Sequence, residues 1–79
     1  MAIVRKLSFQ PLETASKHTE THGTYALVTD ENGTKYLQID TYGSAERKLE
    51  GKKSQSIRLA EEAARQLAQI IEKHFPAKA

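Results

Sequence analysis

The sequence predicts an α+β domain in which several strands precede a single carboxy-terminal helix. Apolar residues alternate with polar ones at a period of about 2 in residues 34–42 and 54–59, and recur at about 3.6 from residue 60. Between the two best strand candidates stands Asn32-Gly33, a pair typical of tight hairpin turns. Since 79 residues suffice for one domain, we expect residues 1–79 to form a single β-β-β-β-α unit.

Four segments have the composition of strands. Their ranges are 2–9, 24–30, 34–42 and 54–59. In the third segment Leu37 and Ile39 share one face, and in the fourth Ile57 and Leu59 do so. We expect these four side chains in the core beneath the helix.

The segment of residues 11–22 is polar and rich in threonine. It predicts a further strand from about Thr14 to His22, because threonine favours strands, and a loop is the alternative. His18 and His22 have the spacing of a helical metal pair, but on a strand they would lie about 13 Å apart. That separation is too large for a shared ion, so no metal site is expected.

The segment from about Ala60 to His74 is predicted to be a helix that Pro76 stops. Its apolar side chains form two adjoining stripes, the first of Ala63, Leu67 and Ile70, and the second of Ala64, Ala68, Ile71 and Phe75. The stripes span an arc of roughly 160°, whereas covering one sheet needs about 100°. We therefore predict that the second stripe packs against a second copy in a homodimer. The alternative is that the amino-terminal segment folds over it.

Positive charge is concentrated in one part of the chain. The formal net charge is only +2, but residues 11–34 carry −3 and residues 44–58 carry +3. The cations of the basic segment are Arg47, Lys48, Lys52, Lys53 and Arg58. A local excess of this kind favours an anionic partner.

Catalysis is not expected from this chain. It contains no cysteine, no serine in a nucleophile elbow, and neither a phosphate-binding nor a dinucleotide-binding glycine motif, so no cofactor is expected either. Residues 1–10 have no apolar run long enough for a signal peptide, and no apolar run in the sequence reaches the length of a membrane span. A cytoplasmic location is the expectation.

The remaining candidate site combines the basic segment with aromatic side chains. Tyr36 and Tyr42 are predicted to lie with Arg58 on the sheet face away from the helix. Exposed aromatic rings beside cations can stack unpaired bases while the cations neutralise phosphates. The alternative is a solvated loop with tyrosines that merely cover the sheet.

The order of strands, basic loop, short strand and terminal helix resembles the positive cofactor four family of transcriptional coactivators, whose bacterial relatives bind single-stranded DNA. The resemblance covers roughly residues 34–74, and its matching positions are Ile39, Tyr42, Gly51, Lys52, Ile57, Leu59 and either Glu61 or Glu62. It implies a four-stranded antiparallel sheet with one carboxy-terminal helix packed on one face, dimerisation through the helices, and nucleic-acid binding on the open face. The sequence departs from the family at Asp40, where the family has arginine, and by two extra residues within Ser54-Gln55-Ser56.

Together these observations predict a small homodimer that binds single-stranded DNA or RNA and has no catalytic role. The expected nucleic-acid contacts are Tyr36, Tyr42, Arg47, Lys48, Lys52, Lys53 and Arg58. The expected dimer contacts are Ala64, Ala68, Ile71 and Phe75. The alternative function is a dimeric protein-interaction module whose basic loop docks an acidic partner and whose tyrosines form a hot spot.

Overall fold

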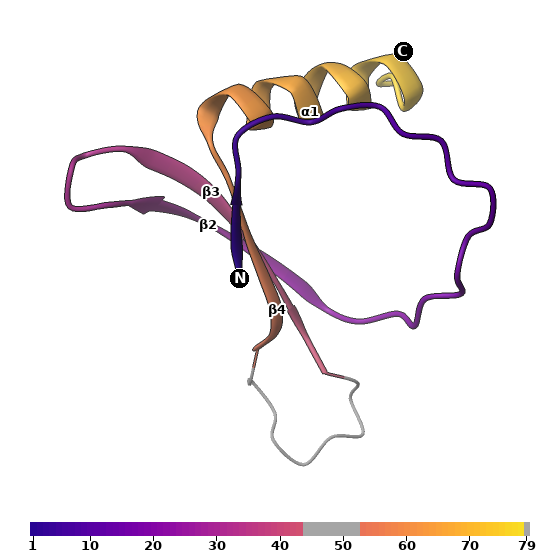
Figure 1. Ribbon diagram of the computed structural model, residues 1–79, viewed down its shortest axis with the longest axis horizontal. Coiled ribbons are helices and arrows are strands. Elements are labelled where there is room, and N and C mark those ends of the chain that lie inside the picture. Colours follow the sequence, from indigo (N-terminus) through magenta and orange to yellow (C-terminus); the bar gives the residue numbers. More distant parts are fainter. Residues whose placement is uncertain (44–52, 79) are drawn as a thin grey trace.

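The computed structural model describes residues 1–43 and 53–78 as four strands and one helix (Figure 1). These elements are β1 (Ala2–Val4), β2 (Gly23–Thr29), β3 (Lys35–Tyr42), β4 (Lys53–Leu59) and α1 (Glu61–His74). The strands form one sheet in the order β1-β4-β3-β2, with α1 lying across one end of it. The predicted α+β class and the terminal helix are confirmed.

The sheet is mixed, so the expectation of an antiparallel sheet is wrong. β3 pairs antiparallel with β2 and with β4, but β1 runs parallel to β4, with Ala2 opposite Ile57 and Val4 opposite Leu59. A short hairpin would force an antiparallel direction on neighbouring strands. β1 is joined to β2 by residues 5–22, which carry the chain from one sheet edge to the other, so no tight turn sets its direction.

Those connecting residues also differ from expectation. The first strand ends at Val4 instead of Phe9, and residues 14–22 do not form the predicted strand. Instead the chain follows a wide arc beneath α1 (Figure 1). The Gln66 side chain holds the start of the arc, because its amide donates to the Leu7 carbonyl at 3.1 Å and accepts from the Leu7 N–H at 2.9 Å. β1 pairs with β4 as far as Val4, which lies opposite Leu59, the last residue of β4. Threonine propensity alone did not pair residues 14–22 with the sheet, although β1 and β2 are its edge strands.

The hairpin between β2 and β3 is confirmed, and Asp30 organises it. The Asp30 carboxylate accepts hydrogen bonds from the backbone N–H groups of Asn32 (2.8 Å) and Thr34 (2.9 Å). The Gly33 N–H donates to the Asp30 carbonyl at 3.0 Å, and Gly33 has a φ of +83°. Glycine suits this position because a left-handed conformation costs other residues more.

The core is small and lies where β4 passes into α1. The helix packs against β3 and β4, and Leu59, Ala60 and Ala63 are buried at this contact. Of the four predicted core residues, only Leu59 is buried; Leu37 and Ile39 are half-buried, and Ile57 is exposed. The helix α1 lacks the length and apolar character needed to cross a membrane.

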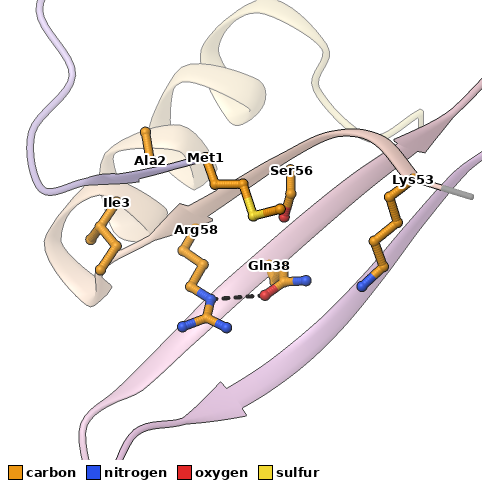
Figure 2. Close-up of a pocket in the computed structure, with 7 residues that line it drawn as sticks. All are labelled: Met1, Ala2, Ile3, Gln38, Lys53, Ser56 and Arg58. Carbon is orange, nitrogen blue, oxygen red and sulfur yellow. Dashed lines mark hydrogen bonds between the residues drawn. The ribbon is translucent and has the colours of Figure 1, made fainter.

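Strand register divides the sheet side chains between two faces. The apolar face carries Tyr25, Leu27, Leu37, Ile39, Ile57 and Leu59. The polar face carries Thr24, Val28, Tyr36, Gln38, Asp40, Ser56 and Arg58. In Figure 2 the helix lies behind β4, whereas Gln38 and Arg58 stand on the near side.

Candidate nucleic-acid interface

Asp40 is the centre of a polar network on the polar face. It lies in β3, only 4% exposed, directly opposite Ser56 of β4. Lys53 Nζ lies 3.2 Å from its Oδ2, and Gln38 Nε2 donates to its two carboxylate oxygens at 3.1 and 3.0 Å. The buried carboxylate therefore has the partners that a charge needs when it is removed from water.

Asp40 sets the orientation of the Gln38 amide, and Gln38 in turn holds Arg58. A carboxylate only accepts hydrogen bonds, so the Gln38 amide nitrogen turns toward Asp40 and its Oε1 faces the other way. This oxygen accepts a hydrogen bond of 2.8 Å from Arg58 Nε, drawn as a dashed line in Figure 2. Asp40 thus fixes the Arg58 guanidinium through one intervening side chain.

The charge of Asp40 does not oppose anion binding on this face. Hydrogen bonds from the Ser56 hydroxyl and the Gln38 amide, together with Lys53, lower the pKa of Asp40 despite its desolvation. The carboxylate is therefore ionised at neutral pH and its charge is matched by Lys53. Arg58 remains as the cation whose hydrogen-bond partner is a neutral amide.

A hollow of about 390 Å³ opens beside this network (Figure 2). Its lining combines apolar residues from the amino terminus with polar residues from β3 and β4. These are Met1, Ala2, Ile3, Gln38, Lys53, Ser56 and Arg58. Ile3 lies opposite Arg58 in the parallel pairing of β1 with β4, which brings an apolar side chain next to the guanidinium.

The two tyrosines predicted to stack bases are less accessible than expected. Tyr36 is only 6% exposed, so the prediction that it presents a ring to solvent is wrong. Its hydroxyl donates to Asp30 Oδ2 at 3.3 Å, which ties it to the hairpin. Tyr42 is half-buried, its hydroxyl lies 2.9 Å from Thr24 Oγ1, and its ring centroid lies 6.0 Å from that of His22. Period-2 alternation identifies a residue's face but not its depth.

The other predicted site residues fall in three groups. Arg47, Lys48 and Lys52 lie outside the described residues. Lys53 and Arg58 come together on the polar face through Asp40 and Gln38. On α1, Ala64 is half-buried and Ala68 and Ile71 are exposed, as is Phe75 directly after the helix.

Gln38 was not predicted as a site residue. The signal was present in the alternation of β3, which places Gln38 on the same face as Asp40 and opposite Arg58. Asp40, which stands where the related family has arginine, is a buried acid that pairs with Lys53 and orients Arg58 through Gln38.

Within residues 1–43 and 53–78, no three histidine, aspartate, glutamate or cysteine side chains cluster as metal ligands. His18 Nδ1 lies 2.9 Å from the Ser16 carbonyl. No protein-family model matches the chain, and neither the curated proteins nor the solved structures contain a significant match to it. The case for function therefore depends on the geometry of the polar face.

Proposed function

We propose that this protein binds single-stranded nucleic acid on the polar face of its sheet, as a binding protein and not as an enzyme. The observation that carries this proposal is the fixed Arg58 guanidinium, aligned by Gln38 on a face that the helix leaves open. An arginine held in place loses little conformational entropy when it binds a phosphate, and its fork suits phosphate oxygens.

A single strand fits this surface better than a duplex. Duplex bases are read in grooves that admit a helix or a two-stranded ribbon, whereas unpaired strands lie across open surfaces that combine cations with aromatic rings. The polar face offers Lys53 and Arg58 along one strand and Tyr42 at the end of the next. Arg47, Lys48 and Lys52 remain predicted additional phosphate contacts.

The test is fluorescence anisotropy with a labelled oligothymidine and a duplex of equal length at 50 and 200 mM salt. We expect tighter binding of the single strand, and a salt slope of about −0.7 for each phosphate contact. Arg58→Ala should weaken binding and make the slope shallower by about 0.7. Arg65→Ala is the matched control, because Arg65 is an exposed helix arginine paired with Glu61. Absence of single-strand binding at low salt would refute the proposal.

We further propose that the protein acts as a homodimer. Tyr25 and Leu27 of the apolar face are 79% and 76% exposed, and Ile71 and Phe75 leave an apolar stripe exposed on α1. In each chain, therefore, the part of the apolar face formed by β2 is not covered by α1, and the exposed apolar stripe at α1 is not covered by the sheet. A two-fold arrangement of two copies can cover both surfaces at once, because each copy offers what the other lacks.

Light scattering after size exclusion tests the homodimer. The unmodified chain should have twice its monomer mass at micromolar concentration, and Leu27→Glu should reduce the mass to that of a monomer. Leu12→Glu is the matched control, since Leu12 is equally exposed but lies in the long connection and not in the sheet. A monomer mass at every concentration would contradict the homodimer.

A further inference from the structure

We propose that the hollow beside β1 is a subsite for one unpaired base and that Arg58 selects guanine there. The inference rests on the proposed function, because the base belongs to the bound strand. It adds base selectivity, which backbone contacts by cations alone do not provide.

The lining of the hollow favours a base over a phosphate. One wall carries the Ile3 side chain, which lies on the same face as Arg58, gives a phosphate no hydrogen bond and can contact the flat face of a ring. The opposite side carries the polar groups of Gln38, Ser56 and Arg58. The volume of about 390 Å³ lies within the range of roughly 300–1,000 Å³ that is typical of small-molecule sites.

The hydrogen bonding of Arg58 determines which base fits. Its Nε is already bonded to Gln38, so the two terminal nitrogens, seen beyond that bond in Figure 2, form the fork available to a ligand. Guanidinium nitrogens only donate, and guanine presents two adjacent acceptors, O6 and N7. On the corresponding edge adenine places a donor beside N7, thymine presents a single acceptor and cytosine presents a donor, so guanine alone matches the fork there.

Gln38 acts as a positioning residue for this selection. Without Asp40 its amide could rotate and present the nitrogen to Arg58, where two donors would face each other. The carboxylate prevents that rotation by accepting from the amide nitrogen with both oxygens. Selectivity should therefore depend on Gln38 although this residue need not touch the base.

The test compares labelled oligothymidines that differ in one central base. The oligonucleotide with guanine should bind about 5- to 150-fold more tightly than the one with adenine, which is the range expected for one bidentate contact to a base. Inosine keeps O6 and N7 and should bind like guanine, whereas 7-deazaguanine lacks N7 and should lose most of the advantage. Equal affinity for all four oligonucleotides would overturn the guanine subsite and leave single-strand binding in place.

Variants then assign the effect to the fork, with the guanine-to-adenine affinity ratio as the readout. Arg58→Lys keeps the charge but removes the fork, so the ratio should fall to about one, and Gln38→Leu should lower it in the same direction. Arg65→Lys is the control and should leave the ratio unchanged. A ratio that survives Arg58→Lys in a variant with an unaltered circular dichroism spectrum would also overturn the inference. If a variant does not fold, the comparison of guanine, adenine, inosine and 7-deazaguanine on the unmodified protein tests the guanine subsite. Failure of every oligonucleotide to bind would refute the proposed function itself.

Discussion

The two faces of the sheet reverse the usual relation between polarity and burial. On the polar face, Asp40 and Tyr36 are almost completely removed from solvent. On the apolar face, Tyr25 and Leu27 keep more than three quarters of their surface exposed. The polar face is shielded by its own side-chain contacts, whereas the apolar face is covered by α1 only near Leu59.

This difference indicates that the two faces are completed in different ways. Hydrogen bonds among Gln38, Asp40 and Arg58, with the ion pair to Lys53, satisfy the buried carboxylate of the polar face within one chain and hold Arg58 in place. The exposed apolar side chains belong to a domain with a small core, and such a surface favours coverage by a second copy. The proposed ligand binding therefore belongs to the polar face and the proposed self-association to the apolar face.

The largest expected effect is the loss of a core side chain on the covered part of the apolar face. Leu59→Ala should lower the free energy of unfolding by about 2–5 kcal/mol, because Leu59 is buried against the helix. Urea denaturation measures this loss. Leu27→Ala changes the same residue type on the same face and should cost less than about 0.5 kcal/mol in dilute monomer. The effect of Leu27→Ala on the free energy of unfolding should grow at concentrations where the proposed dimer forms. If both variants lower the free energy of unfolding equally in dilute solution, the difference in burial is contradicted.

A smaller effect is expected from the centre of the polar face. Asp40→Ala removes the acceptor shared by Gln38 and Lys53 and should lower the urea midpoint clearly. Glu61→Ala also removes a carboxylate from an ion pair, but the Glu61–Arg65 pair is exposed and should contribute only about 0.3–0.5 kcal/mol. If the two variants have the same midpoint, the Asp40 network is not a stabilising element.

The smallest effect should appear in acid. The pKa of Asp30 is lowered chiefly by the Thr34 backbone N–H, and that of Asp40 chiefly by the Ser56 hydroxyl. Both folded pKa values lie below the unfolded value of about 3.9, so their contribution to stability is present above about pH 4 and is lost as the pH falls through the folded values. Melting temperatures measured from pH 6 to pH 2 should fall on the acid side and recover on neutralisation. The double variant Asp30→Asn, Asp40→Asn should show a flatter profile, and an unchanged profile would contradict the assignment to these two groups.

Local features were predictable where neighbouring residues determine them. The hairpin at Asn32-Gly33 and the helix ending at His74 formed as expected, because turn chemistry and helical periodicity act over a few residues. The parallel direction of β1 and the lack of a strand in residues 14–22 were not predictable, since both depend on pairing between segments far apart in the chain. Within the candidate site, Lys53 and Arg58 were identified from charge, but Gln38 required the register between β3 and β4.

The sequence by itself determined the class of the fold, the two faces of each strand and the excess of apolar surface on the helix. These properties follow from composition and period, which are local. Only the tertiary structure decided how deep each side chain lies and which partners it meets. It buried Tyr36 and exposed Leu27, and it turned Asp40 from an isolated negative charge into the residue that positions Arg58. Depth and hydrogen bonding depend on contacts between residues distant in the chain, and alternation along one strand carries no information about them.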